Sequence, residues 1–191
     1  MKVEYPLKNL ENLYSDRLTY QLLKVSDLQE FHELIIIPEV DKFNTMGIPE
    51  SIEVTRQLLD EAIKEQNKKK VNKLTYSVKL KGTEDFIGVC GIIKSSEKYA
   101  KAELWMKFNP KFWNNGYATE TIQTLLKACF EKYQLHRVEA GCAVENHASK
   151  RVLEKCSFIV EGIQRKNLPL KSGWSDNYEF GILEEEYHKK Y

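Results

Sequence analysis

Apolar and polar residues alternate with a period of two in several short stretches of the chain, and this pattern is typical of strands. Leu18, Tyr20 and Leu22 occupy every second position, as one face of a strand requires. Similar alternation or short apolar runs predict strands at 74–80, 86–93, 102–108, 138–144, 158–163 and 178–183. We therefore expect a central sheet of about seven strands.

Between these strands, apolar residues recur at spacings of three and four, which indicates amphipathic helices. Ser26 with Gln29 predicts a capping box at the start of the first helix, and Ser51 is a typical N-cap for the second. The four expected helices run from Leu28 to Pro38, from Ser51 to Lys68, from Ile122 to Tyr133, and from Asn146 to Cys156.

The order of these elements predicts a mixed α/β (α+β) fold. Three adjacent strands joined by short turns favour antiparallel pairing. The strand–helix–strand step across 122–133 favours one parallel pair. Because no repeat or long linker interrupts the pattern, we expect a single domain over residues 1–191.

Composition and charge exclude several classes of function. The 29 basic residues nearly cancel the 28 acidic ones, so the net charge of +1 gives no reason to expect nucleic acid or an acidic membrane as a partner. Residues 34–37 form the longest apolar run, which is too short to span a membrane. Residues 1–10 lack the apolar core of a signal peptide, and we expect a cytoplasmic protein.

The cysteines and histidines do not form a metal-binding pattern. The four cysteines are widely separated, and each lies within an apolar pattern. That distribution is typical of reduced, buried thiols rather than of a disulfide framework. No histidine lies at metal-ligand spacing from another histidine or a cysteine, so we expect no metal.

A turn between a strand and a strong helix, at residues 112–120, is the clearest candidate for a ligand site. Backbone N–H groups converge in a tight turn at a helix start, and the helix dipole adds positive potential. Gly116 and Ala118 keep side chains small where the backbone would approach a phosphate, and Asn115 and Gly116 both tolerate positive φ. The alternative is an ordinary Asn–Gly turn that leads into a helix.

Three segments together carry a resemblance to a known family: Ala102–Met106, Trp113–Glu120 and Glu145–Ser149. In this order and spacing they resemble the GNAT superfamily of N-acetyltransferases, and specifically its branch of RimJ/RimL-like protein N-terminal acetyltransferases. The resemblance extends from Asp16 to about Leu183 and is strongest over 102–183. It implies the GNAT fold, in which two strands splay apart to admit coenzyme A.

The resemblance also implies acetyl-CoA as the co-substrate. The turn amides would hold its pyrophosphate, and the strands 102–108 and 137–144 would splay to admit its pantetheine arm. The implied coenzyme contacts are Met106, Phe108, Asn114, Asn115, Gly116, Tyr117, Ala118, Thr119 and Asn146.

Some residues depart from the family pattern. Trp113 stands where the superfamily often has Gln or Arg, and Asn114 where the RimJ/RimL branch commonly has glycine. The turn would therefore depend more on backbone amides than on a side-chain charge. Ser157 replaces a common glycine at a helix end, which predicts a slightly strained C-cap.

Acyl transfer to an amine needs a base for the ammonium proton and a proton for the leaving thiolate. Glu103, a charged residue inside an apolar strand, is the candidate base; alternatively it is a glutamate on the wet face of that strand. By resemblance, Ser149 is the candidate donor, because Leu153 stands where many members have tyrosine. Water is the alternative donor, and Ser149 is then an unremarkable first-turn residue.

The acceptor side is expected to involve the segments near Pro38–Pro49 and Trp174–Tyr178. The candidate substrate contacts are Phe43, Trp105, Trp174, Asp176 and Tyr178. Aromatic side chains with one carboxylate suit a peptide N-terminus, and they also suit a polyamine or an aminoglycoside. The sequence leaves open a non-catalytic acyl-CoA-binding module as a rival class, and a monomer or a homodimer as the assembly.

Overall fold

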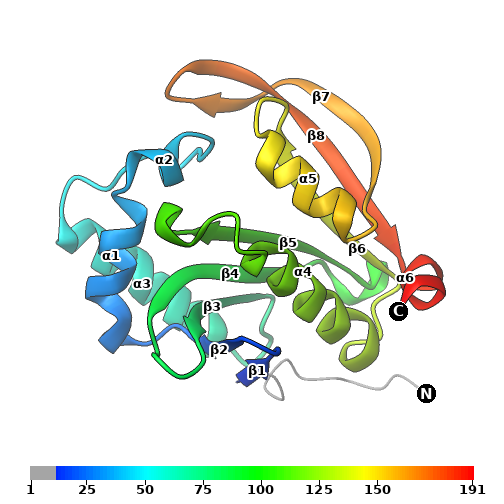
Figure 1. Ribbon diagram of the computed structural model, residues 1–191, viewed down its shortest axis with the longest axis horizontal. Helices are drawn as coiled ribbons and strands as arrows, with labels where there is room; N and C mark the ends of the chain where they lie inside the picture. Colours follow the sequence, from blue (N-terminus) through cyan, green and yellow to red (C-terminus); the bar gives the residue numbers. More distant parts are fainter. Residues whose placement is uncertain (1–11) are drawn as a thin grey trace.

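The computed structural model describes residues 12–191, which form one mixed sheet with helices on both faces (Figure 1). The expectation about residues 1–10 lies outside this range. The eight strands follow the order β1-β2-β3-β4-β5-β6-β8-β7. They are β1 (Asn12–Tyr14), β2 (Leu18–Leu22), β3 (Lys73–Leu80), β4 (Phe86–Lys94), β5 (Lys101–Phe108), β6 (Arg137–Ala143), β7 (Ile159–Leu170) and β8 (Gly173–Leu183).

The mixed sheet with one parallel pair is confirmed, and each of the seven expected strands is present. The additional strand, β1, has only three residues and pairs with β2. It is too short for a period of two to be recognised. The last two strands form a hairpin longer than predicted, because polar residues continue both strands toward the turn at Lys171 and Ser172.

Six α-helices accompany the sheet in the described range, against about four expected. Ser51 and Asn146 are confirmed as N-caps: Ser51 accepts from the Val54 N–H at 3.4 Å, and Asn146 accepts from the Ser149 N–H at 3.1 Å. The helices are α1 (Leu28–Ile35), α2 (Pro38–Asp41), α3 (Ile52–Gln66), α4 (Tyr117–Lys127), α5 (His147–Lys155) and α6 (Glu184–Lys190).

The predicted capping box at Ser26 is wrong. The chain makes a 3-10 turn at Val25–Asp27 before α1, and the carboxylate of Asp27 accepts from the Lys24 N–H at 3.0 Å. Pro38 likewise begins α2 instead of ending α1, because its fixed φ suits the first position of a helix.

The third expected helix begins earlier than predicted, at Tyr117, and changes at Ala128 into a π-helical segment that ends at Lys132. The predicted strain at the end of α5 is confirmed, since Ser157 has a φ of 67°.

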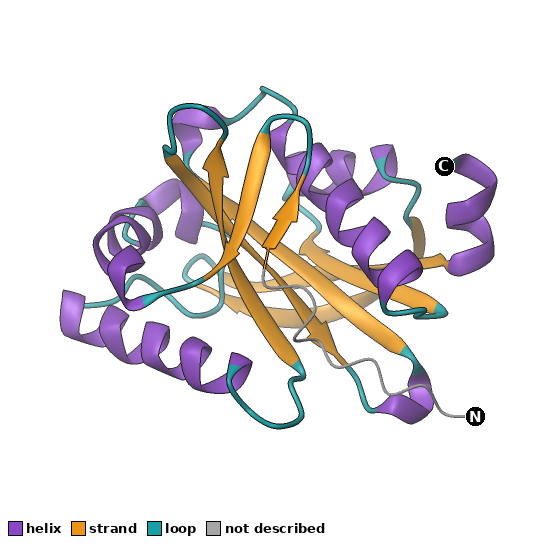
Figure 2. Ribbon diagram, turned by 90° about the horizontal axis from the view of Figure 1, so that it is seen from below, coloured by secondary structure: helices purple, strands orange, loops and turns teal. Residues whose placement is uncertain are grey.

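The helices divide between the two faces of the sheet (Figure 2). Helices α4 and α5 pack on one face, where Leu104, Ile122 and Leu153 belong to the larger apolar cluster. Helices α1 and α3 pack on the other face, where Leu34, Leu59 and Val89 form a second cluster. The two faces of the sheet are therefore covered by two separate apolar clusters.

The parallel pair β5–β6 is short. Only Lys101, Ala102 and Glu103 are in register with a partner on β6, and Glu103 lies opposite Glu139 at the last paired position. Beyond that position β5 continues to Phe108, and none of the strands in residues 12–191 pairs with it on its β6 side. This opening is the splay that the sequence resemblance implies.

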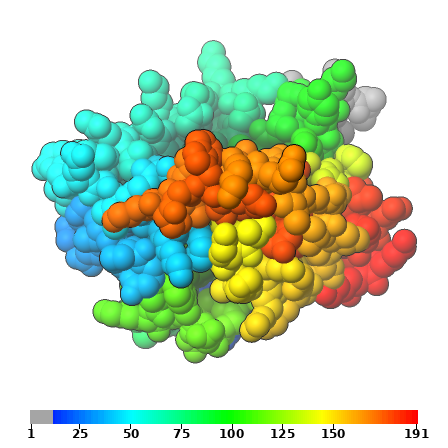
Figure 3. All heavy atoms as spheres, turned by 90° about the horizontal axis from the view of Figure 1, so that it is seen from above, coloured from blue at the N-terminus to red at the C-terminus, as the bar shows by residue number. Residues whose placement is uncertain are grey.

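Seen from above, the β7–β8 hairpin extends toward the segment that contains α2 (Figure 3). The side view agrees, with the tip of the hairpin beyond α2 on the same side of the molecule (Figure 1). Two segments far apart in sequence thus border the open end of the splay. None of the helices in residues 12–191 is long and apolar enough to cross a membrane.

Candidate active site

The turn before α4 has the backbone conformation of an anion cradle. Asn114 has a φ of 62° and Gly116 a φ of 82°, so Gly116 uses its tolerance of positive φ, and the second left-handed residue is Asn114. Asn115 instead braces the turn: its amide donates to the carbonyl of Trp113 at 2.9 Å. The left-handed Asn114 explains why this position takes a residue that tolerates positive φ.

The N–H groups of this turn are available to a ligand. In the described part of the chain, none of the backbone N–H groups from Asn114 to Thr119 donates to a backbone acceptor, and Glu120 N is the first to bond, to Gly116 O at 3.0 Å. Tyr117, Ala118 and Thr119 are the first residues of α4, an 11-residue helix. Unpaired donors at a helix N-terminus fit a pyrophosphate group.

An ion pair between Glu120 and Arg17, which lies in the turn between β1 and β2, holds this turn in place. Glu120 binds Arg17 with 2.7 Å between Oε2 and Nε, and it accepts from the Ser15 hydroxyl at 2.7 Å. Arg17 in turn donates to the carbonyl of Asn115 at 3.0 Å and lies 4.6 Å above the ring of Tyr117. Sequence reasoning missed Arg17 because its contacts span about a hundred residues.

The coenzyme contacts expected on β5 lie on the helix α4 face. Phe108 is buried in the larger cluster, and Met106 packs against it. Trp113 is 44% exposed and fixes the end of β5 by donating from Nε1 to the carbonyl of Phe108 at 2.8 Å. The splayed strand and the amide turn are therefore joined as one structural unit.

Glu103 and Trp105 lie on the opposite side of β5. Trp105 packs against the α1–α3 cluster, and its indole covers Gly91 of β4, where an added Cβ would meet ring atoms at 2.3 Å. Residues at positions 103, 105 and 107 share this side because side chains alternate along a strand. We call this side the acceptor face, because Trp105, an expected contact of the acceptor, lies on it.

Glu103 and Glu139 are neighbours with different partners. Lys101 binds Glu139 at 2.8 Å, and Arg137 Nε binds it at 2.9 Å. The carboxylate of Glu103 makes no hydrogen bond or ion pair with the residues described in 12–191. Partial burial and the charge of Glu139 raise the pKa of Glu103, with Lys101 opposing them. A free carboxylate of raised basicity stands where the splay begins.

Ser149 faces β6 from the first turn of α5. Its hydroxyl interacts with the thiol of Cys142, the residue on β6 beneath the helix start. Burial raises the pKa of Cys142 to about 11, so this thiol stays protonated at neutral pH. Ser149 and Asn146 thus lie on the flank of the splay formed by β6, across from β5.

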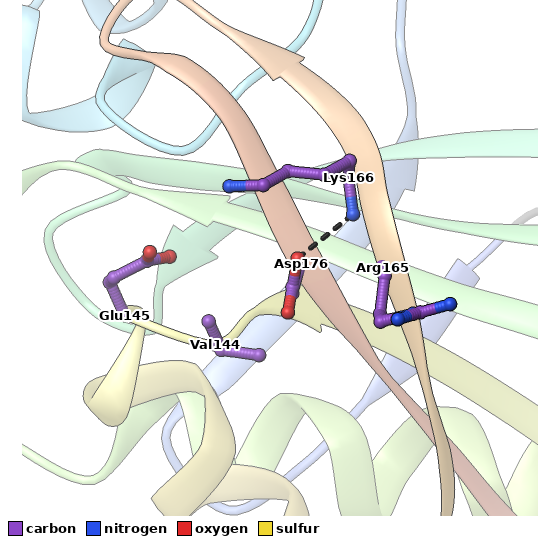
Figure 4. Close-up of a pocket in the computed structure, with 5 residues that line it drawn as sticks. All are labelled: Val144, Glu145, Arg165, Lys166 and Asp176. Carbon is purple, nitrogen blue, oxygen red and sulfur yellow. Dashed lines mark hydrogen bonds between the residues drawn. The ribbon is translucent and has the colours of Figure 1, made fainter.

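Near the start of α5, an open pocket of about 750 Å³ adjoins the β7–β8 hairpin (Figure 4). Val144, Glu145, Arg165, Lys166 and Asp176 line it. Asp176 accepts from the Lys166 N–H at 2.8 Å, and the Lys166 side chain extends toward the side where Glu145 lies, away from Arg165.

This pocket brings together charges that sequence reasoning did not connect. Glu145 is anchored by the Ser175 hydroxyl at 2.6 Å, and Trp174 lies on a second hollow beside Lys166. Of these residues, the sequence analysis named Asp176 and Trp174 for the acceptor side. Glu145, Arg165 and Lys166 give no periodic signal, since they lie at exposed positions of a turn and an edge strand.

The two remaining acceptor candidates lie apart from this pocket. Phe43 follows α2, with the Lys42 ammonium 5.2 Å from its ring centre. Tyr178 lies under Lys150 of α5 at 4.7 Å and packs toward the larger cluster. Tyr178 therefore lies beneath α5, on the side of the sheet that α4 and α5 cover.

Comparison with known proteins agrees with this geometry. Residues 17–159 match the family model for the acetyltransferase (GNAT) domain. The N-acetyltransferase p20 of Bacillus licheniformis is 28% identical over 182 residues, covering 93% of this chain and 99% of that protein. A spermidine N(1)-acetyltransferase of Vibrio cholerae is 25% identical over 104 residues, covering 54% of this chain and 60% of that enzyme.

Solved structures share the fold along nearly the whole chain. A GNAT-family acetyltransferase from Bacillus anthracis has a TM-score of 0.80 at 30% identity, covering 91% of this chain and 99% of that one. The Vibrio cholerae spermidine N-acetyltransferase in complex with CoA and spermine has a TM-score of 0.80 at 22% identity, covering 91% and 99%. The splayed sheet, the amide turn and the matched residues agree: this chain belongs to the GNAT family of acetyltransferases.

Proposed function

We propose that this protein transfers an acetyl group from acetyl-CoA to a primary amine, chiefly the α-amine of a peptide or protein N-terminus. The observation that carries the proposal is the splay between β5 and β6. It has the free N–H row of Asn114–Thr119 at its open end and the unpaired carboxylate of Glu103 at its closed end. A coenzyme whose pyrophosphate is bound by this N–H row would extend its thioester arm toward Glu103.

In this proposal Glu103 takes the proton from the acceptor ammonium, directly or through one water. A carboxylate with a raised pKa is a better base, and its neighbour Glu139 is already held in ion pairs with Lys101 and Arg137. The α-amine suits this base because its ordinary pKa, about 7.7–8.0, lies well below that of an alkyl amine.

The leaving thiolate is stabilised from the opposite flank of the splay. Ser149 offers its hydroxyl from the N-terminus of α5, where the helix dipole favours developing negative charge. A water in the same place is the alternative donor. Asn146 keeps this end of the helix in position through its cap to the Ser149 N–H.

Direct transfer in a ternary complex is proposed because the described cysteines are poor nucleophiles. All four are free and buried. Burial raises the pKa of Cys129 to about 12 and of Cys156 to about 11. An acetyl-cysteine intermediate needs a thiolate, which these thiols do not provide at neutral pH.

The peptide acceptor is supported by the mixed charge of the pocket beside the splay. Glu145 and Asp176 attract an ammonium, while Lys166 attracts carbonyl or carboxylate oxygens of the same ligand. A peptide carries both kinds of group close together. We accordingly assign the chain to the RimJ/RimL-like branch and place its reaction in the cytoplasm, where free cysteines persist.

The second candidate is acetylation of a small amine such as a polyamine, supported by the sequence likeness to the Vibrio cholerae spermidine enzyme. The test is mass spectrometry of a panel of peptides and small amines incubated with the protein and acetyl-CoA. Peptide N-terminal acetylation is the expected product. Exclusive acetylation of polyamines would replace the peptide proposal. Acetyl-CoA binding without any product would indicate a non-catalytic acyl-CoA-binding module.

A further inference from the structure

Lys107 places an amine on the acceptor face with no direct partner. It lies opposite Val89 on β4, two residues beyond Trp105 on the same side of β5. Its side chain is half-buried, and it makes no hydrogen bond or ion pair among residues 12–191. Since β6 has already diverged from β5, this edge of the strand pairs with no other strand in the described part of the chain.

The carboxylate that acts on Lys107 belongs to Asp41 of α2. Asp41 is itself buried, and its Oδ1 already accepts from the amide of Asn44 at 3.2 Å. Burial lowers the pKa of Lys107, and the charge of Asp41 opposes that shift without abolishing it. A half-buried ammonium without a bound acceptor is costly, and an incoming anion or carbonyl oxygen would remove that cost.

The position of Lys107 indicates which residue of a bound peptide would supply this oxygen. Lys107 lies four residues from Glu103, which is about 13 Å along a strand at roughly 3.3 Å per residue. An extended peptide advances about 3.3–3.6 Å per residue. With the reacting amine at Glu103 and the lysine side chain covering part of the distance, the oxygen would come from the second or third residue of a peptide.

We propose that Lys107 determines acceptor specificity, by binding an acidic side chain near the N-terminus of a peptide acceptor. This inference rests on the proposed function. The same ammonium disfavours acceptors that bring a second positive charge to this place, polyamines among them, because like charges repel across a partly buried site. Lys107 thus favours peptide acceptors with an acidic side chain and disfavours acceptors with a second positive charge.

The test uses two sets of three peptides, identical except for Glu, Gln or Lys at the second residue in one set and at the third residue in the other, with spermidine as a further acceptor. Acetylation kinetics are measured for the wild type, Lys107→Met and Lys107→Arg. Lys127→Met, a change at an exposed lysine on α4, controls for net charge. The wild type is expected to show a KM roughly tenfold lower for the Glu peptide than for the Gln peptide.

Lys107→Met is expected to remove this preference and to improve the Lys peptide and spermidine, with the acetyl-CoA KM unchanged. Lys107→Arg and Lys127→Met should keep the preference. If Lys107→Met lowers the melting temperature and slows all acceptors alike, Lys107 only holds α2 to β5 and the proposal is overturned. Equal KM values within both peptide sets in an active wild type overturn it as well. A wild type that binds acetyl-CoA and acetylates no acceptor overturns the proposed function, and the role of Lys107 with it.

Discussion

The indole of Trp105 lies directly on the backbone of Gly91, the residue opposite it on the neighbouring strand. An added Cβ at Gly91 would stand 2.3 Å from the indole nitrogen, closer than any real contact allows. Gly91 therefore leaves the space in which the ring folds back onto β4. The acceptor face beside the splay depends on this arrangement.

Gly91→Ala is expected to displace the indole. Overpacking of this kind costs about 1–3 kcal/mol of stability. Because Trp105 borders the acceptor face, the acceptor KM should rise while acetyl-CoA affinity stays near that of the wild type. Gly162→Ala is the matched control, since a Cβ there meets nothing within 4 Å. A lowered melting temperature with both KM values unchanged would show that Trp105 has a structural role alone.

Gly116→Asp is expected to abolish acetyl-CoA binding, because it adds a side chain and a negative charge where the pyrophosphate would lie. Acetyl-CoA at about 100 times its Kd should stabilise the wild type by roughly 2.7 kcal/mol. That stabilisation should disappear in the variant. Gly82→Asp, at a turn glycine with a φ of 92° and open space around it, controls for the backbone strain. Equal melting shifts in both variants would contradict the assignment of the turn.

The ion pair between Arg17 and Glu120 predicts a pH dependence. Burial by itself raises the pKa of Glu120, but hydrogen bonds from the Arg17 backbone and side chain and from Ser15 outweigh it, so the net pKa is lowered. This contribution to stability is complete above the unfolded-state pKa of about 4.3 and is lost as pH falls through the lower folded-state value. Glu120→Gln should flatten the acid limb of the melting temperature profile.

Arg17→Met complements this variant. It removes the guanidinium from the carbonyl of Asn115 and the ring of Tyr117. Acetyl-CoA affinity, measured by calorimetry, should fall by more than the affinity for the acceptor. An unchanged acetyl-CoA affinity would mean that the turn holds its shape without the clamp.

Glu103→Gln is expected to lower kcat by roughly 10²–10⁴-fold with acetyl-CoA affinity near normal. The pKa of Glu103 is raised in the folded state, so its ionisation disfavours folding, and the disadvantage appears as pH rises through that pKa. The variant should consequently be at least as stable as the wild type at neutral pH. It should also lack the acid limb of the kcat profile. Undiminished turnover across pH would show that Glu103 is a glutamate on the wet face of the strand and not the base.

Local patterns predicted most of the fold, and long-range contacts account for what they did not predict. The caps at Ser51 and Asn146 depend on residues three positions away, and both were predictable. The start of α1 was not, because Lys24 and Asp27 close a 3-10 turn ahead of the apolar stripe.

The candidate site shows the same limit. The amide turn follows from local composition, and only the left-handed conformation of Asn114 needed coordinates. The partners of Glu139 come from β5 and β6, and the pocket at Glu145 is completed by a hairpin that begins more than a dozen residues later. The hydrophobic pattern of the sequence does not predict these contacts, because they form between segments that meet only when the sheet assembles.

Ser149→Ala tests the remaining assignment, the proton donor to the leaving thiolate. The hydroxyl faces the thiol of Cys142 on the β6 flank of the splay, and the N–H of Ser149 holds the cap to Asn146. Alanine keeps that N–H, so the helix start should survive and the melting temperature should change little. Turnover should fall if the hydroxyl supplies a proton or a hydrogen bond at sulfur.

Asn146→Ala provides the contrast, because it removes the cap and should cost about 1 kcal/mol of stability. Restoring a hydroxyl with Leu153→Tyr is a poor rescue, since Leu153 is 2% exposed within the larger cluster and a tyrosine there would overpack it. Steady-state rates and melts of the two alanine variants therefore decide the matter. A Ser149→Ala protein with normal stability and undiminished turnover leaves water as the donor, because the backbone geometry of the helix start is then intact and the hydroxyl is dispensable.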